Sequence, residues 1–305
     1  MKKKRSNTVR IALIQMRAGA RPSDNLKKAL AKIREAARKG AKIICLQELF
    51  SSPYFPQIED AKNFTLAEPV PGPSLQALSE AARSLKVVII ASLFEKRTDG
   101  IYHNTAAVLD ADGSFLGKYR KMHIPDDPGY YEKFYFTPGD LGFQSFSTRY
   151  AKVGVLVCWD QWFPEAARIT VLSGAQILFY PTAIGWLDRE PPKARKAQQA
   201  AWEIIQRSHA VANGVFVASV NRVGKEKKIK FWGSSFISDP FGQILAKAAA
   251  EKEKVLIADC RLDQIRETRE GWPFLRDRRI DAYGALNSRL IDQTQPAPLA
   301  ESLRD

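Results

Sequence analysis

The sequence contains few of the residues that form disulfides or bind metal ions. It has three cysteines and three histidines in 305 residues, and both sets are widely spaced. An odd number of scattered cysteines argues against a disulfide framework and favours a reducing compartment. Neither CxxC nor HExxH spacing is present, so a zinc site would lack any local signature. We therefore expect a cytoplasmic protein with no bound metal.

Long apolar runs and nucleotide-binding motifs are absent as well. The apolar runs are short, as at residues 87–91, whereas a membrane-spanning helix needs roughly 18 apolar residues. The basic residues 2–5 are typical of the start of a signal peptide, but Gln15 and Arg17 break the apolar stretch that follows. The chain also lacks the GxxxxGKS/T and GxGxxG patterns of nucleotide-binding loops. We expect neither a membrane partner nor a cofactor.

Acidic residues are scarce relative to basic ones. Lys and Arg number 47 against 33 Asp and Glu, which gives a net charge of +14. Such an excess raises an alternative of a different class, a basic nucleic-acid-binding protein or one that binds an acidic membrane surface. However, the basic residues in segments 27–39, 225–230 and 276–279 have acidic or apolar neighbours, and no RNA-binding, zinc-finger or basic-zipper pattern accompanies them. We predict a solvated basic surface and no specific nucleic-acid partner.

Apolar segments and helical patterns alternate along the chain. The first half predicts strands at 9–16, 42–48 and 87–94, a helix that Ser23 caps and Gly40 ends, a helix at 74–85, and a hairpin over 102–121. The second half repeats this order, with strands at 152–157, 176–180, 215–220 and 255–260, helices at 164–173 and 197–212, and a hairpin over 232–248. The alternation predicts an α/β fold with sheets inside and helices outside. We expect one domain over residues 9–285, a basic tail at 1–8 and a C-terminal tail at 286–305.

Cys158 stands at the end of an apolar strand, and the polar and aromatic residues 159–165 then lead into a helix. A side chain at such a turn faces a cleft, and the free N–H groups of the turn can stabilise a thiolate or an oxyanion. The simpler interpretation, a small buried hydrophobic residue, is the common one for a free cysteine, and we apply it to Cys45 and Cys260. The polar surroundings of Cys158 favour a nucleophile.

A cysteine nucleophile needs a partner that removes its proton, because a thiol with a pKa near 8.5 is mostly neutral at pH 7. His123 and His209 could each pair with it, although no motif connects either histidine to Cys158. Carboxylates are the other option. Glu48 and Lys121 both stand at the ends of predicted strands, so each can reach the cleft that Cys158 faces.

A resemblance to the nitrilase (carbon-nitrogen hydrolase) superfamily is carried by three strand-end segments, residues 46–50, 117–123 and 157–165. The likeness covers most of the chain and implies a four-layer αββα sandwich, with mixed sheets inside and helices outside. It also implies a catalytic triad, which would consist of Glu48, Lys121 and Cys158. Two longer segments, 123–140 and 180–185, resemble the branch that hydrolyses the ureido group of N-carbamoylputrescine.

This resemblance implies cleavage of a ureido C–N bond through a covalent thioester-type intermediate on Cys158. Glu48 would act as general base and then as general acid, while Lys121 and the backbone N–H of Trp159 would hold the oxyanion. Glu132, an additional glutamate, would hydrogen-bond Lys121 or the substrate nitrogen. A ureidopropionase-like carbamoylase and an aliphatic amidase remain alternatives.

A substrate derived from a diamine has a cationic end, so a carboxylate should face it. The candidate carboxylates in the nearest loops are Asp126, Asp127 and Asp188, although each could instead form a turn. Further candidates for substrate contact are Tyr130 and Trp186. Residues 186–192 depart from the Ser-Glu-Pro pattern of many relatives, which puts substrate contacts from that loop in question.

The resemblance also implies partners. Members of the superfamily usually form homo-oligomers, and the aromatic, arginine-containing segment 272–276 is the predicted interface. We expect a small cationic ureido substrate and further copies of this chain.

Overall fold

Two six-stranded sheets form the centre of the structure, a computed structural model that describes residues 7–291. The first sheet has the order β17-β1-β2-β3-β4-β5, with β1 (Thr8–Gln15), β2 (Ile43–Leu46), β3 (Val88–Thr98), β4 (Ile101–Leu109), β5 (Phe115–Arg120) and β17 (Lys254–Arg261). The second has the order β16-β15-β12-β10-β9-β8, with β8 (Ser145–Ser147), β9 (Lys152–Val155), β10 (Ile177–Thr182), β12 (Phe216–Asn221), β15 (Phe236–Ser238) and β16 (Ile244–Lys247). Each sheet takes its strands mainly from one half of the chain.

Helices connect the parallel strands of both sheets, because parallel neighbours need a crossover connection. In the first sheet, β1, β2 and β3 are parallel, and α1 (Pro22–Arg38) and α2 (Pro73–Leu85) lie between them in the chain. In the second sheet, β9, β10 and β12 are parallel, and α3 (Pro164–Leu172) and α4 (Pro192–Asn213) take the same places. The two halves therefore share one plan, as the repeated order of elements predicts.

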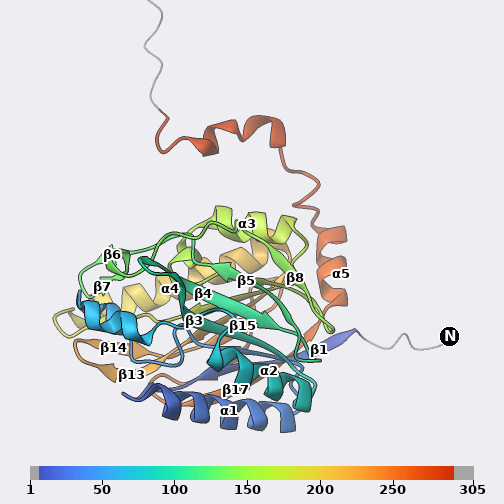
Figure 1. The fold of residues 1–305 in the computed structure, drawn as a ribbon. Coiled ribbons are helices and arrows are strands. Elements are labelled where there is room, and N and C mark those ends of the chain that lie inside the picture. The colour runs from blue at the N-terminus through green and yellow to red at the C-terminus, as the bar shows by residue number, and fades with distance from the viewer. Residues whose placement is uncertain (1–6, 292–305) are drawn as a thin grey trace, which may run out of the picture.

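The sheets face each other, and the helices cover their outer faces (Figure 1). Side chains alternate along each strand, so one set meets the other sheet and the next set meets the helices. In β1, Leu13 belongs to the core between the sheets, while Ala12 packs in the core that includes Ile33 of α1. All three side chains are fully buried. This arrangement confirms the predicted αββα sandwich.

Two local details differ from the sequence-based expectations. Helix α1 begins at Pro22 with Arg21 at its N-cap, so Ser23 lies inside the helix and caps nothing. The basic run 225–230 exposes Lys225, Lys227 and Lys228 as expected, but it also forms strands that the sequence did not predict. It belongs to a small sheet of order β11-β14-β13, made of β11 (Gly185–Leu187), β13 (Val223–Glu226) and β14 (Ile229–Trp232).

Several further elements were not anticipated. A two-stranded ladder joins β6 (Asp126–Asp127) to β7 (Tyr130–Tyr131), and α5 (Asp263–Gly271) follows the last strand. Short 3-10 helices are η1 (Phe55–Gln57), η2 (Ala61–Leu66), η3 (Glu132–Phe134), η4 (Cys158–Trp162), η5 (Ile280–Ala282) and η6 (Gly284–Asn287). Two of them, η3 and η4, carry residues that the sequence assigns to the site.

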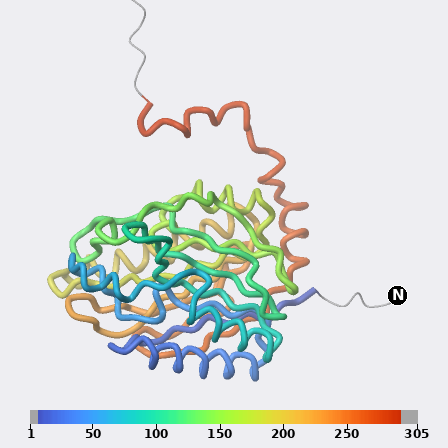
Figure 2. Tube along the Cα trace, viewed as in Figure 1, coloured from blue at the N-terminus to red at the C-terminus, as the bar shows by residue number. Residues whose placement is uncertain are grey.

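The end of the described chain leaves the body of the molecule. After α5, residues 272–291 extend away from the sandwich (Figures 1 and 2). Of the predicted tails, residues 1–6 and 292–305 lie outside the described residues, and the division into 9–285 and two tails stays a prediction. Within residues 7–291, no helix has the length and apolar character needed to cross a membrane.

Candidate active site

Three strand ends from the two sheets meet at the candidate site. Glu48 follows β2, Lys121 follows β5, and Cys158 opens η4 after β9. Their exposed fractions are 0%, 1% and 5%, so all three polar side chains are buried. Strands β2 and β5 belong to the first sheet and β9 to the second. The packing of one sheet on the other therefore brings these residues together.

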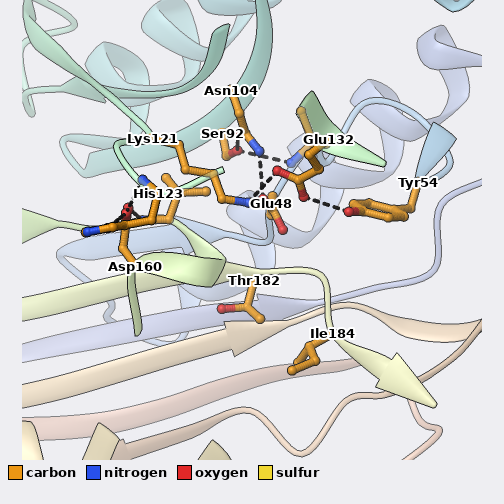
Figure 3. Close-up of polar contacts among 12 residues, drawn as sticks. Glu48, Tyr54, Ser92, Asn104, Lys121, His123, Glu132, Asp160, Thr182 and Ile184 are labelled. Atoms are coloured by element: carbon orange, nitrogen blue, oxygen red, sulfur yellow. Dashed lines mark hydrogen bonds and ion pairs between the residues drawn. The ribbon is translucent and has the colours of Figure 1, made fainter. Parts of the chain in front are cut away.

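A buried lysine lies between two buried glutamates (Figure 3). Lys121 Nζ donates to Glu48 Oε1 at 3.0 Å and to Glu132 Oε2 at 2.6 Å. Tyr54 donates its hydroxyl hydrogen to the other oxygen of Glu132, at 2.6 Å. Glu132 is fully buried, so it is not the exposed loop carboxylate that its neighbours in the sequence would indicate.

Burial and mutual charge set the ionisation of this cluster. Burial raises the pKa of Glu132 to about 7, and the negative charge of Glu48 adds to the rise, although Lys121 and the Tyr54 hydroxyl act against it. Burial alone would lower the pKa of Lys121, but the two adjacent carboxylates outweigh it and hold that pKa above its usual value. Lys121 is therefore a permanent cation in the site.

Glu48 is fixed through one oxygen and open at the other. Its Oε1 accepts hydrogen bonds from Lys121 and from Asn104 Nδ2, the latter at 2.7 Å. Its Oε2 is buried and has no hydrogen-bond partner among the described residues. A buried oxygen without a partner is costly unless a ligand or a transferable proton satisfies it. The open oxygen is thus available for chemistry.

Arg222 holds the backbone that carries Glu48. Its Nη2 donates to the carbonyl oxygens of Glu48 at 3.0 Å, Leu49 at 2.9 Å and Ser52 at 3.2 Å. Leu49 has a φ of +47°, a left-handed conformation that a branched residue rarely adopts without support. Arg222 and Asn104 are not among the site residues that the sequence predicts. A polar residue at or just beyond an apolar strand was the only signal for either.

The turn at Cys158 is also strained and also held. Cys158 has a φ of +46°, which directs the chain sharply from β9 into η4. Asp160 secures the turn, because its carboxylate accepts from the backbone N–H of Val157 at 2.8 Å, the backbone N–H of His123 at 3.0 Å and the Tyr119 hydroxyl at 2.8 Å. The turn is therefore rigid before any substrate arrives.

The thiol of Cys158 is neutral at rest. Burial raises its pKa well above the usual value, and the charges of Glu48 and Glu132 add to the rise, whereas Lys121 and a backbone hydrogen bond with Ala183 oppose it. A nucleophile in this state needs a base beside it. Cys45 and Cys260 lie in the core strands β2 and β17, and burial raises the pKa of each.

Neither histidine is placed as that base. His123 Nδ1 lies 2.7 Å from Asp160 Oδ1, and its ring stacks on Phe163 with a centroid distance of 3.7 Å. His209 Nε2 lies 2.8 Å from the carbonyl oxygen of Gln161. The Cys-His alternative that the sequence left open has no geometric support in the described residues. No group of three or more His, Cys, Asp or Glu within residues 7–291 is placed to hold a metal ion.

Cys158 opens onto a cavity of about 420 Å³. Two predicted site residues, Tyr130 and Trp159, line this cavity together with Trp162 and Trp232. The charged side chains that line it, among the described residues, are Asp127, Arg189 and Glu190. Glu190 was not singled out from the sequence, because the loop that carries it departs from the pattern of related enzymes.

Three predicted substrate-binding residues lie elsewhere. Asp126 is exposed on β6, and its neighbour Asp127 lines the cavity in its place. Asp188 pairs with Lys225 at 2.9 Å and lines an adjacent hollow. Trp186 stands behind the cavity wall: its indole N–H donates to the carbonyl oxygen of residue 195 at 3.0 Å, and its ring packs on Trp232. These three residues do not line the cavity that Cys158 faces, and their roles in substrate binding stay predictions.

Comparison with known proteins agrees with this geometry. The carbon-nitrogen hydrolase family model matches residues 10–270. The chain belongs to the carbon-nitrogen hydrolase family. It is 46% identical to an N-carbamoylputrescine amidase of Oryza sativa over 91% of this chain and 94% of that protein, and 41% identical to a citrullinase of Francisella tularensis over 90% and 96%. A crystal structure of a carbon-nitrogen hydrolase from Helicobacter pylori G27 superposes with a TM-score of 0.90 at 47% identity, covering 93% of this chain and all of that one.

Proposed function

We propose that the protein hydrolyses N-carbamoylputrescine to putrescine, ammonia and carbon dioxide. The observation that carries the proposal is the buried Glu48–Lys121–Glu132 cluster, whose charges act on Cys158 at the wall of the cavity. The 46% identity to an N-carbamoylputrescine amidase over nearly the whole chain supports the choice of substrate.

In the first step, Glu48 acts as the base. Its open Oε2 takes the thiol proton as Cys158 Sγ forms a bond to the ureido carbon. The carbonyl oxygen becomes an oxyanion, which Lys121 Nζ and the N–H of Trp159 stabilise. Collapse of this intermediate breaks a C–N bond, and Glu48 returns its proton to the leaving nitrogen. The product is a thioester-type adduct on Cys158.

In the second step, Glu48 takes a proton from water as the water oxygen attacks the adduct. The oxyanion forms again at the same place, and its collapse breaks the S–C bond and returns a proton to Cys158 Sγ. Hydrolysis of the carbamoyl adduct releases carbamic acid, which decays to ammonia and carbon dioxide. Lys121 stays protonated throughout, because two carboxylates hold its pKa high.

A substrate panel tests the proposal. Ammonia release is measured from N-carbamoylputrescine, N-carbamoyl-β-alanine, citrulline and simple aliphatic amides at equal concentration. We expect the highest kcat/KM with N-carbamoylputrescine. A preference for N-carbamoyl-β-alanine would refute the cationic substrate and leave the Cys-Glu-Lys chemistry standing. Turnover of amides alone would refute ureido hydrolysis.

We also propose that the C-terminal arm, residues 272–291, packs against a second copy of the chain. The large apolar side chains that the arm exposes are Trp272, Phe274, Ile280, Tyr283, Leu286, Leu290 and Ile291, with exposed fractions from 38% to 76%. A segment this apolar is costly in water and typical of an interface. The double substitution Ile280→Asp and Leu286→Asp should reduce the sedimentation mass toward that of one chain. An unchanged mass would refute the role of the arm.

A further inference from the structure

A short loop between β11 and α4 holds one carboxylate at the wall of the cavity. The backbone N–H of Glu190 donates to the carbonyl oxygen of Leu187 at 3.1 Å, and the N–H of Leu187 donates back to Glu190 Oε2 at 2.8 Å. Gln198 Nε2, on α4, donates to Glu190 Oε1 at 2.7 Å. Each carboxylate oxygen keeps a further lone pair, so Glu190 is positioned but not saturated.

The loop itself is anchored to α4. Arg195 Nη2 donates to the carbonyl oxygens of Leu187 at 3.2 Å and Asp188 at 2.8 Å. The indole N–H of Trp186 donates to the carbonyl oxygen of Arg195 at 3.0 Å. A carboxylate on so constrained a loop loses little conformational entropy when it binds a ligand.

The charge of the cavity wall contrasts with that of the whole chain. The protein carries +14, yet the cavity is lined by two carboxylates, Asp127 and Glu190, and by one cation, Arg189. Asp127 and Arg189 are exposed, whereas Glu190 is half-buried. An exposed ion pair contributes little because water screens it, and a partly desolvated pair contributes more. Glu190 is therefore the stronger site for a cation.

The rest of the wall suits an alkyl chain between the two ends of a substrate. Tyr130, Trp159, Trp162 and Trp232 provide an aromatic surface in the same cavity as Cys158. Apolar walls with a few fixed polar groups are typical of small-molecule sites. A ureido group at Cys158 and an ammonium at Glu190 would leave the methylene groups against these rings.

We infer that Glu190 binds the terminal ammonium of the substrate and that Gln198 is the residue that positions it. This inference rests on the proposed function and deepens it. The substrate class is then N-carbamoyl amines with a cationic end. Glu190 then determines the specificity from the loop between β11 and α4.

The test compares Glu190→Gln with the wild type on two substrates of equal carbon number, N-carbamoylputrescine and the uncharged N-carbamoylbutylamine. Glutamine preserves the shape and can keep both hydrogen bonds, because its amide oxygen accepts from Leu187 N–H and its NH₂ group donates to Gln198 Oε1 once the Gln198 amide has turned over. We expect kcat/KM for the charged substrate to fall at least tenfold, mainly through KM. The value for the neutral substrate should change less than twofold, which also shows that the variant is folded.

Two further variants sharpen the result. Gln198→Ala keeps the charge of Glu190 but removes its support, so we expect a smaller rise in KM that is again confined to the charged substrate. Glu165→Gln, at an exposed carboxylate in the first turn of α3, should leave both substrates unchanged. If Glu190→Gln does not fold, the Gln198→Ala result decides the question by the same criterion.

The outcomes separate this inference from the proposed function. Equal losses on both substrates, or no loss on either, would refute the role of Glu190 while ureido hydrolysis stands. A selective loss in Asp126→Asn or Asp127→Asn, with none in Glu190→Gln, would show that a carboxylate of β6 binds the ammonium instead of Glu190. A wild-type enzyme that hydrolyses neither ureido compound would refute the proposed function and this inference together.

Discussion

Replacing Glu132 by glutamine tests the electrostatics of the buried cluster. Glu132 accepts hydrogen bonds from Lys121 and Tyr54, each at 2.6 Å, and is fully buried. Glutamine has the same shape, can still accept from Lys121 and carries no charge at any pH. The substitution therefore removes one titration from the folded protein.

The magnitude follows from the pKa of Glu132. Its folded pKa is raised from 4.5 to about 7, chiefly by burial. A carboxyl group whose pKa is raised by folding contributes its full stabilisation at pH values below its pKa in the unfolded chain. That contribution is lost as the pH rises through its pKa in the folded protein. The stabilisation is therefore lost over the range from about pH 4.5 to about pH 7. A rise in pKa from 4.5 to about 7 corresponds to about 3 kcal/mol of free energy of unfolding, at about 1.36 kcal/mol for each tenfold change in the ionisation constant.

The assay is urea unfolding of the wild type and Glu132→Gln at pH 5 and pH 8, at one protein concentration so that any association is the same. The free energy of unfolding of the variant, relative to that of the wild type, should rise by on the order of 2–3 kcal/mol from pH 5 to pH 8. Glu165→Gln controls for the loss of one negative charge from a basic chain. Parallel curves for Glu132→Gln and the wild type would refute a raised pKa at Glu132.

Three other predictions concern the nucleophile, the arginine that supports Glu48, and the effect of a chelator. Cys158→Ser should abolish ammonia release while circular dichroism stays native, whereas Cys45→Ala should keep its turnover; activity in Cys158→Ser would disprove the assignment. Arg222→Met should lower the free energy of unfolding by about 3–5 kcal/mol, because Glu226, its partner at 2.9 Å, loses a buried counter-ion. A loss under 1 kcal/mol in urea unfolding would contradict this reasoning. EDTA should leave activity unchanged, and a loss that zinc reverses would reveal a metal site.

Much of the fold could be predicted from the sequence, because the signals are local. Apolar runs such as 43–46 predict buried strands, and the spacing of Leu26, Leu30 and Ile33 predicts a helix with one apolar face. The same local signals place Glu48, Lys121 and Cys158 at strand ends. Because each of the three stands at a strand end, the sequence predicts that all of them reach one cleft.

The environment of each site residue could not be predicted, because it comes from partners far along the chain. Arg222 supports the backbone of Glu48 from 174 residues away, and Tyr54 meets Glu132 from 78 residues away. No periodicity connects such pairs. The neutral thiol, the permanent cation and the raised pKa of Glu132 are all consequences of burial, which only the packing of the two sheets decides.

The wall of the cavity shows the same division. In the sequence Asp126 stands five residues after Lys121 and is a reasonable partner for a cationic substrate. In the tertiary structure its side chain is exposed on β6, while Glu190 is brought to the cavity by a loop that Gln198 and Arg195 of α4 hold. Local sequence determines which segments become strands, helices and turns. Which charges face the substrate depends on how those segments pack, since burial and hydrogen bonding are properties of the assembled fold.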